Sequence, residues 1–342
     1  MNATPGLRHG PRGRQQALRG RGEQIALALA SLALALTFLR PTASMPLPQV
    51  DAVVVFDVTQ SMNVADAAAG NAKPIARLEF AKQEFGRLVP LLPCGSKLGW
   101  GIFTDNRSFL LIEPIEVCAH SRELVAELRR IDGSMAWSGN SEVAKALNSG
   151  MRMVDALPGR PALVFVSDGH EAPPISPNYR PAFSLARGKV RGLLLGVGGD
   201  VPQPIPKLNP AGRSLGHWQA TEVVQVDPRT LGRAGNREVM VDSPDIGLAL
   251  QVGATPGSEH LSSLRETYLQ LLASETGLPY QRLGDAKGLH AMLTGPPLAS
   301  TIESPTDLRP ALAAVALLAL FLPVLMTAAG ALRRRATRSA RP

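Results

Sequence analysis

A polar pattern with one carboxylate and two hydroxyls, Asp57-x-Thr59-x-Ser61, directly follows an apolar and β-branched run at 53–56. The run predicts a strand that is buried on both faces. Three oxygen-bearing side chains at alternate positions, just past the end of a strand, can turn toward one point. Oxygen-only ligands suit a hard divalent cation, Mg²⁺ before Zn²⁺. The alternative is that Thr59 and Ser61 merely cap a turn.

Two further segments supply candidate ligands for the same cation. Ser141 stands just before a helical pattern that starts at Glu142, and Asp168 ends a second apolar run at 163–167. Open α/β sheets place their binding sites at the carboxyl ends of parallel strands. We therefore expect Ser141 and Asp168 to join the first pattern at one edge of a sheet.

These five positions resemble the metal-ion-dependent adhesion site of the von Willebrand factor A domain, with Ser141 in place of the family's usual loop threonine. The resemblance implies that Thr59, Ser61 and Ser141 bind a cation through their hydroxyls. It also implies that Asp57 and Asp168 hold the cation's waters. The implied cofactor is Mg²⁺, with Ca²⁺ or Mn²⁺ as alternatives. Because two carboxylates leave the ion under-neutralised, its free position is expected to bind an Asp or Glu of a partner protein.

Three residues beside the expected site are candidates for a contact with that partner. His170 and Glu171 follow Asp168, and Trp137 precedes the segment with Ser141. We interpret all three as rim residues. A catalytic role for His170, as a base toward metal-bound water, is an alternative, but no nucleophile or second base accompanies it, so we assign no catalytic residue. Trp137 is otherwise a packing residue that shapes its loop, which is the commoner use of such a tryptophan.

Buried strands alternate with amphipathic helices along the chain. This alternation predicts a doubly wound, mostly parallel α/β sheet flanked by helices, of the von Willebrand A or Rossmann-like class. The predicted helices cover 78–92, 121–131, 142–157, 264–276 and 285–293, and the predicted strands cover 97–104, 108–112, 163–167, 190–197 and 278–283. Residues 200–257 are rich in Pro and Gly and break the alternation. We interpret them as an insertion, with strand-like pieces at 221–226 and 238–241.

Basic residues exceed acidic ones, and the excess lies at the two ends of the chain. The 342 residues include 36 Lys and Arg against 28 Asp and Glu. Ten arginines lie between an end of the chain and the nearer of two apolar runs, at 25–39 and 310–332. They are Arg8, Arg12, Arg14, Arg19, Arg21, Arg333, Arg334, Arg335, Arg338 and Arg341. Without them and Glu23, 26 basic and 27 acidic residues remain, so the middle of the chain is about neutral. Aromatic residues make up only 4%, which gives no basis for a nucleic-acid stacking surface.

The two apolar runs predict membrane segments. Residues 25–39 are short for a span, which needs ~17–25 residues, and are expected to form a membrane anchor or a signal segment. Residues 310–332 are long enough for a transmembrane helix. Because positive charge favours the cytoplasmic side, the arginine-rich ends are expected to be cytoplasmic. Buried core helices are the alternative for both runs.

These features predict a protein of the bacterial inner membrane whose globular domain lies in the periplasm. The chain then divides into a basic cytoplasmic tail (1–24), an anchor or signal segment (25–39), a periplasmic von Willebrand A domain (50–295), a linker (296–309), a transmembrane helix (310–332) and a second basic cytoplasmic tail (333–342). A Pro-rich, polar tether at 40–49 joins the first membrane segment to the domain.

Cys94 and Cys118 are the two cysteines of the chain. Cys94 follows a predicted helix at a proline-marked end and Cys118 follows a predicted hairpin, so both are expected near one margin of the sheet. An exported compartment permits a disulfide between them, which would add on the order of 3 kcal/mol. Two buried free thiols are the alternative. Metal binding by the pair is not expected, because no His or Cys partner lies at ligand spacing.

Five stretches resemble one bacterial branch of the A-domain family, the MxaL-type accessory proteins of the methanol dehydrogenase system: 57–63, 77–82, 92–96, 116–120 and 168–174. The resemblance implies maturation or metal loading of a periplasmic quinoprotein dehydrogenase, with methanol dehydrogenase or other maturation factors as partners. Bat-type proteins share the arrangement of anchor, A domain and anchor, and are the alternative branch. A metal-dependent hydrolase is the alternative from another class, and a purely structural scaffold is a third.

Overall fold

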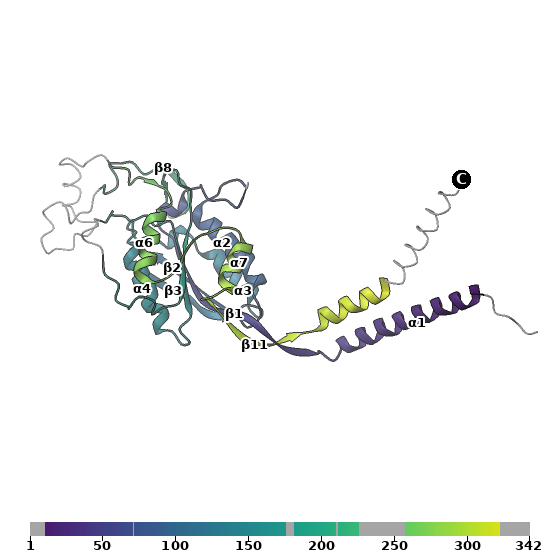
Figure 1. Ribbon diagram of the computed structural model, residues 1–342. Coiled ribbons are helices and arrows are strands. Elements are labelled where there is room, and N and C mark those ends of the chain that lie inside the picture. Colours follow the sequence, from purple (N-terminus) through teal and green to yellow (C-terminus); the bar gives the residue numbers. More distant parts are fainter. Residues whose placement is uncertain (1–10, 71, 176–180, 210, 226–256, 322–342) are drawn as a thin grey trace, which may run out of the picture. The chain divides into compact units, whose positions relative to one another are not determined.

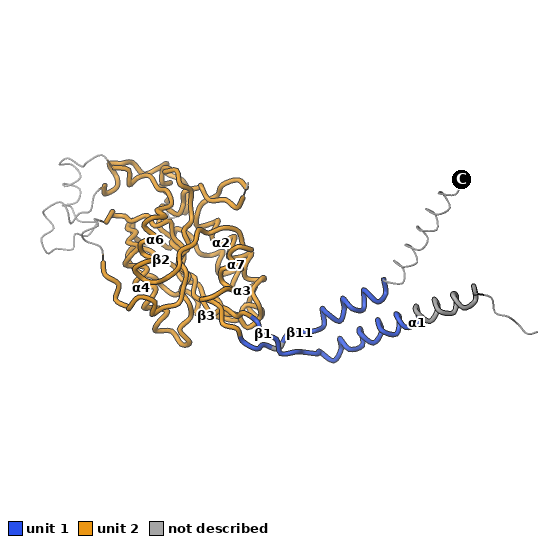
Figure 2. Tube along the Cα trace, viewed as in Figure 1, with its two compact units in different colours: residues 1–47, 302–342 blue, residues 48–301 orange. Residues whose placement is uncertain are grey.

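The chain forms two compact units, residues 48–301 and residues 1–47 together with 302–342 (Figure 2). The computed structural model describes residues 11–70, 72–175, 181–209, 211–225 and 257–321. The first of these units contains the predicted A domain and all candidate site residues.

A mostly parallel sheet organises the unit of residues 48–301. Its strand order is β10-β5-β4-β1-β2-β3. The strands are β1 (Thr42–Asp57), β2 (Lys97–Thr104), β3 (Arg107–Glu116), β4 (Ala162–Ser167), β5 (Gly192–Gly196) and β10 (Tyr280–Arg282). All neighbours along this path pair in parallel except β2 and β3, which form an antiparallel hairpin. This confirms the predicted parallel α/β sheet, including the antiparallel edge.

Helices cover both faces of the sheet. Helices α2 (Arg77–Leu88), α3 (Ser121–Arg130) and α7 (Ala286–Thr294) lie on one side, and α4 (Val143–Ala156) and α6 (Glu266–Thr276) lie on the other (Figure 1). Successive residues of β1 supply both cores, because side chains alternate between the faces of a strand. Ala52, Val54 and Phe56 pack into one core, and Val53 and Val55 pack into the other. A strand buried on both faces therefore explains the uninterrupted apolar run.

The strand order places a topological switch between β1 and β4. From β1, the chain adds β2 and β3 on one side of the sheet, and then adds β4 and β5 on the other. In open α/β sheets the crevice at such a switch, outside the carboxyl ends of the strands, is where ligands bind. Asp57 is the last residue of β1, and Asp168 directly follows β4. The fold therefore brings the two predicted aspartates to the position that this class of sheet uses for binding.

Small paired strands form within the first part of the insertion at 200–257 and just after its end. Strand β6 (Gln203–Pro204) pairs with β9 (Leu261–Ser262), and β7 (Pro206–Leu208) pairs with β8 (Ser214–His217), both antiparallel. The sequence did not predict these strands. Of the two strand-like pieces predicted there, residues 221–225 form turns and bends instead, and 238–241 lie outside the described residues.

The second unit differs from the expected tether and linker. Strand β1 already starts at Thr42, and residues of the expected linker form β11 (Ala299–Asp307), which pairs with β1. Ser44 donates a hydrogen bond to Glu303, and the Leu308 backbone N–H donates to the carbonyl of Pro41. Prolines are tolerated in this ribbon because its strands have free edges, where a missing N–H breaks no ladder.

Two helices complete that unit. Helix α1 (Pro11–Thr37) starts well before the expected anchor, and residues 309–321 form another helix. Ala30 and Ala33 are buried with Ala316 in a small apolar cluster. In the described part of the chain, no helix combines the length and the apolar character needed to cross a membrane. Residues 322–332 of the predicted transmembrane helix lie outside the described residues.

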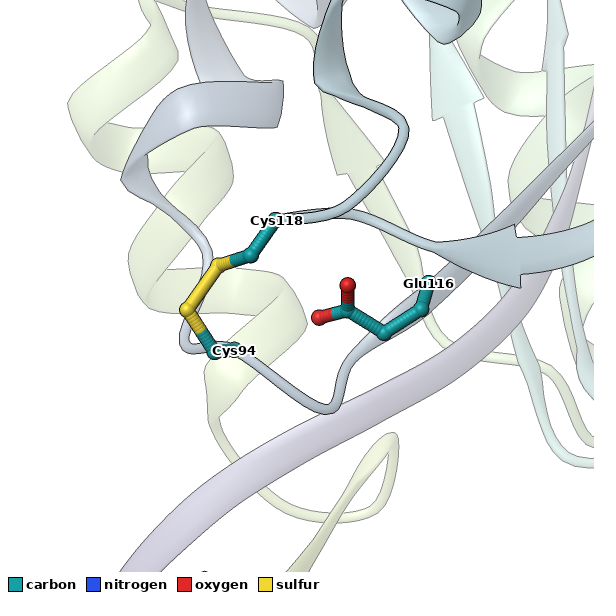
Figure 3. Close-up of side chains that lie close together, drawn as sticks. All are labelled: Cys94, Glu116 and Cys118. Atoms are coloured by element: carbon teal, nitrogen blue, oxygen red, sulfur yellow. A yellow bond between two sulfur atoms is a disulfide. The ribbon is translucent and has the colours of Figure 1, made fainter. Parts of the chain in front are cut away.

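A disulfide joins Cys94 and Cys118, with their Cα atoms 5.3 Å apart. Glu116 lies beside the sulfur atoms (Figure 3). Its carboxylate accepts the backbone N–H groups of Gly95 (2.7 Å) and Ala119 (2.6 Å), which holds its pKa below the usual value against the opposing effect of burial. Glu116 is a third potential metal donor that the search for His and Cys at ligand spacing missed. In the structure, however, the sulfur atoms are bonded to each other and the carboxylate ties the two cysteine loops together.

Candidate metal centre

Three hydroxyl groups converge past the carboxyl end of β1. After Asp57 the chain leaves the strand, and Thr59 precedes a short 3₁₀ helix, η1 (Gln60–Asn63), that carries Ser61. Thr59 Oγ1 lies 3.5 Å from Ser61 Oγ and 3.3 Å from Ser141 Oγ. All three side chains are buried. We call Thr59, Ser61 and Ser141 the hydroxyl triad.

Ser141 reaches the triad because backbone hydrogen bonds fix its loop from two sides. Its N–H donates to the carbonyl of Ala172 (2.6 Å), and its carbonyl accepts the Ala172 N–H (2.9 Å). The next N–H, of Glu142, donates to the carbonyl of Asp105 at the end of the β2–β3 hairpin turn (2.7 Å). Helix α4 begins two residues after Ser141. The loop is therefore pinned between two neighbouring loops of the sheet.

Asp57 lies directly under the triad and is fully buried. Its Oδ1 accepts the backbone N–H (2.9 Å) and the hydroxyl (2.6 Å) of Thr59, and its Oδ2 accepts the Ser167 hydroxyl (2.7 Å). Burial and the neighbouring charge of Asp168 raise the pKa of Asp57 to about 7, although these hydrogen bonds oppose the shift. Within the described residues, no cationic side chain pairs with this carboxylate.

Asp168 has a protein cation as its partner. Its Oδ2 accepts a hydrogen bond from Arg77 Nη1 (2.5 Å) and one from Ser262 Oγ (3.1 Å), and its Oδ1 accepts the His170 N–H (2.9 Å). Burial alone would raise the pKa of Asp168, but the Arg77 charge outweighs it together with these donors, and the pKa is lowered. Asp168 is thus held ionised, whereas the described residues give Asp57 no counter-ion and its pKa of about 7 leaves it only partly ionised at pH 7.

Arg77, the first residue of α2, connects Asp168 to Asp66 and to strand β9 (Leu261–Ser262), and sequence reasoning assigned it no role. Its side chain is fully buried. Nε and Nη2 form a bidentate pair with Asp66 (2.8 and 2.6 Å), while Nη1 also donates to Ser262 Oγ (2.7 Å) in β9. Gly198, at φ +129°, makes room for the guanidinium, because a Cβ there would come within 2.6 Å of Arg77 Nε. The stretch 77–82 carried part of the family resemblance, but no local pattern indicates these partners.

The donors fit a small, hard cation. Around an octahedral Mg²⁺ at about 2.0–2.1 Å, neighbouring ligand oxygens lie about 2.9 Å apart. The triad contacts of 3.3 and 3.5 Å are close to that spacing, so a small contraction would bring the three oxygens to ligand distance. The buried, uncompensated charge of Asp57 is what a divalent cation would neutralise, since a buried charge without a partner is strongly unfavourable.

His170 and Glu171 are not exposed as rim residues would be. The side chain of His170 is 3% exposed, and burial lowers its pKa to about 4, so it is neutral at pH 7. The Glu171 carboxylate accepts the N–H groups of Val143 and Ala144, both at 3.0 Å, and the hydroxyl of Tyr268 (2.6 Å). Glu171 therefore caps the amino end of α4 and ties it to α6. Burial raises its pKa to about 7.

Trp137 is the exposed member of the predicted rim, with 61% of its surface accessible. Its ring meets Phe109 of β3 edge to face, with ring centroids 4.9 Å apart. Phe109 is itself partly exposed. The pair therefore combines both roles considered for Trp137, because the ring packs against its neighbour and still presents an apolar surface.

Comparisons with known proteins yield only distant structural likeness. No family model and no curated protein matches the chain. Among solved structures, BatB from Bacteroides thetaiotaomicron is 17% identical, with 72% of this chain and 95% of that chain covered and a TM-score of 0.44. An aerotolerance-related membrane protein from Bacteroides fragilis is 17% identical over 71% of this chain and 96% of that chain, with a TM-score of 0.43. The manganese-loaded TRAP protein of Plasmodium vivax is 12% identical over 78% and 80%, with a TM-score of 0.39. Such scores carry no argument about function, so the strand order and the site geometry are what describe this chain.

Proposed function

We propose that the hydroxyl triad, with Asp57 and Asp168, binds a divalent cation through which the chain captures a partner protein. Mg²⁺ is the cation we propose, because all the donors are oxygens and lie close together; Ca²⁺ or Mn²⁺ would use the same donors. A bound cation supplies an under-neutralised positive charge that attracts a partner's Asp or Glu. The chain's own residues fix the donors: Ser167 orients Asp57, and Arg77 holds Asp168.

The observation that carries this proposal is a contrast: Asp57 is fully buried and has no cationic partner in the described part of the chain, whereas Asp168 pairs with Arg77. A scaffold role alone does not explain why an unpaired carboxylate lies beneath three converging hydroxyls, because an uncharged residue would be more stable there. A cation-binding role explains both features together.

A pull-down from membranes tests the proposal. The full chain serves as bait with Mg²⁺ and with chelator, and the Asp57→Asn variant serves as a matched bait that keeps the shape of the side chain. We expect a partner that elutes with chelator and is absent from the Asp57→Asn bait. A partner retained equally in all arms would contradict capture through the cation.

The identity of that partner separates two branches of the proposal. The five stretches that resemble MxaL-type proteins support a role in maturation or metal loading of a quinoprotein methanol dehydrogenase. The Bat-type alternative is supported equally by the predicted arrangement of anchor, A domain and anchor. Elution of a methanol dehydrogenase subunit or of its maturation factors would favour the first branch, and elution of an unrelated membrane complex would favour the second.

We propose that residues 48–301 act in the periplasm and that the chain is held at the bacterial inner membrane. The arginine-rich ends and the Cys94–Cys118 disulfide support this compartment, because disulfides persist in oxidising surroundings. A reporter that is active only in the periplasm should give signal when fused at Ser300 and none at Ala340. The reverse pattern would contradict both the compartment and the partner class.

We propose binding rather than turnover for this site. The side chain of His170 is 3% exposed, and burial lowers its pKa to about 4, which makes it a weak base toward metal-bound water. Assays with phosphate and acyl esters are expected to show no turnover above background. Hydrolysis by the wild type that is lost in Asp168→Ala would favour the metal-dependent hydrolase instead.

A further inference from the structure

A cavity of about 180 Å³ lies directly over the hydroxyl triad. Its floor includes Thr59, Ser61 and Ser141, which are nearly inaccessible to solvent. Its walls include apolar side chains of the insertion, namely Ile205, Trp218, Val223 and Val224, and Pro173 from the loop after β4. The insertion therefore turns a cation site at the edge of a sheet into a pocket with a polar floor and apolar walls.

The insertion is bonded to the metal loop itself. Trp218 Nε1 donates a hydrogen bond to the side chain of Gln60, the residue between Thr59 and Ser61. The Trp218 N–H donates to the carbonyl of Ile205 (3.0 Å), and Lys207 lies 4.3 Å from the centre of the indole ring. On the other side, Ser262 of β9 bonds to both Arg77 and Asp168. The wall is thus bonded directly to the metal loop through Trp218, and strand β9, which pairs with β6 at the start of the insertion, is bonded to Arg77 and Asp168.

The acidic side chains in the cavity wall have cationic partners. Glu222 pairs with Lys207 (2.6 Å), and Glu259 lies 3.7 Å from Arg265. Neither acid therefore repels an incoming anion with a full charge. The wall therefore offers a ligand mainly apolar surface, and the volume of about 180 Å³ limits the size of the group that fits. Ligands of drug size use pockets of about 300–1,000 Å³, so this cavity suits a smaller group.

We infer that the insertion makes this cavity a pocket for a carboxylate on a short, unbranched aliphatic stem, with Trp218 as the residue that enforces the stem. The inference rests on the proposed function, because the carboxylate would bind at the cation over the triad. A glutamate side chain of a partner protein and a free short-chain acid share this chemistry. An aspartate, whose carboxylate is one methylene closer to the backbone, would bury less of its stem between the walls.

The test uses the full chain with Mg²⁺ and a series of probes, namely acetate, butyrate and the branched trimethylacetate. Binding is followed by tryptophan fluorescence, since Trp218 lines the cavity, and by calorimetry. Two additional buried methylenes predict that butyrate binds roughly tenfold tighter than acetate. Trimethylacetate should bind no better than acetate, because its branch meets the walls. Trp218→Ala should remove the preference for butyrate while leaving the affinity for Mg²⁺ unchanged.

Two variants keep the result interpretable. Trp137→Ala is the matched control, because that tryptophan is exposed and outside the cavity lining, and it should leave the butyrate preference intact. Gln60→Ala removes the hydrogen bond to Trp218 and part of the cavity lining, and should weaken the preference without unfolding the chain. Capped peptides that differ only in Glu or Asp distinguish the sources: tighter binding of the Glu peptide than of butyrate indicates a protein partner, and the reverse indicates a free acid.

The outcomes separate this inference from the proposed function. Mg²⁺ binding without any preference for stem length, or a preference that survives in Trp218→Ala, would overturn the pocket inference alone. An absence of saturable binding of Mg²⁺, Mn²⁺ or Ca²⁺ would overturn the cation site and the pocket together.

Discussion

Asp57 and Asp168 lie at the ends of neighbouring parallel strands and are equally buried, yet their surroundings are opposite. Asp168 pairs with Arg77, and its pKa is lowered. Asp57 receives only neutral hydrogen-bond donors, and its pKa is raised to about 7, first by burial and then by the charge of Asp168. A protein cation therefore neutralises one carboxylate, and the other is the carboxylate that we propose an external cation neutralises.

Removing Arg77 should have the largest effect on stability. Arg77→Met leaves both Asp168 and Asp66 buried or partly buried without their cation, which is expected to lower the free energy of unfolding by about 3–5 kcal/mol. Urea denaturation measures this loss. Arg130→Met is the matched control, because its side chain is 72% exposed in its pair with Glu127 and should change stability by about 0–1 kcal/mol. Equal effects of the two variants would contradict a structural role for the buried pair.

Replacing each aspartate by asparagine in turn should change the stability of the chain in opposite directions when chelator is present. Asp168→Asn leaves Arg77 without one of its two carboxylates and should destabilise the chain by about 3 kcal/mol. Asp57→Asn removes an uncompensated buried charge and should be neutral or stabilising by about 1 kcal/mol. Thermal melts of both variants in chelator measure the two changes in stability. Destabilisation of the same size in both variants would show that Asp57 and Asp168 have similar electrostatic surroundings, and would contradict this account.

The disulfide should affect stability and leave the metal centre unchanged. Cys94→Ser opens a loop with a sequence separation of 24 and is expected to cost about 3 kcal/mol in the chain-entropy model. Its melting temperature should fall, while its affinity for Mg²⁺ should match that of the wild type. A large loss of Mg²⁺ affinity in Cys94→Ser would show that the cysteine loops and the triad are coupled. Wild-type protein reduced before the melt provides the control for the serine substitution.

The pH dependence of stability should report Glu171. Its folded-state pKa of about 7 is above the ordinary value of 4.5, so between these values the folded chain binds more protons than the unfolded chain. Stability from this group is therefore present below about pH 4.5 and is lost as the pH rises toward 7. From pH 5 to pH 8 this group alone should lower the free energy of unfolding by about 2 kcal/mol, and Glu171→Gln should remove that share of the loss. Asp57, whose pKa is also raised to about 7, adds a loss over the same range that remains in the variant. Urea titrations at both pH values measure it, and an unchanged slope in the variant would contradict the assignment.

The part of the site that is local in the sequence could be predicted. Asp57, Thr59 and Ser61 follow one buried strand and Asp168 follows another, and the parallel order of those strands brings them to one edge. Arg77 could not be predicted, because its partners Asp66, Asp168 and Ser262 meet only after folding and one of them lies beyond the insertion. Glu171 was interpreted as a rim residue because sequence position alone does not distinguish an exposed loop carboxylate from one that caps a distant helix.

The fold was predicted where periodicity is strong and missed where pairing depends on a distant strand. Apolar runs identified the central strands and amphipathic stripes identified the helices. The Pro-rich segment before residue 50 and the linker after 296 were expected to be irregular, but they pair with each other as β1 and β11. Composition argued against these strands because proline lowers strand propensity, and only the meeting of the two segments reveals the ribbon.

Titration of the chelator-treated full chain with Mg²⁺ in a calorimeter tests the central claim most directly. We predict saturable binding to the wild type and to Arg130→Met, and a loss of affinity of at least ~100-fold in Asp57→Asn, since removal of even a supporting residue costs ~10–100-fold. The same weakening should appear for Mn²⁺ and Ca²⁺. Binding that is equally tight in Asp57→Asn, or no saturable binding of any of the three ions to the wild type, would contradict the claim that the hydroxyl triad and Asp57 form a cation site.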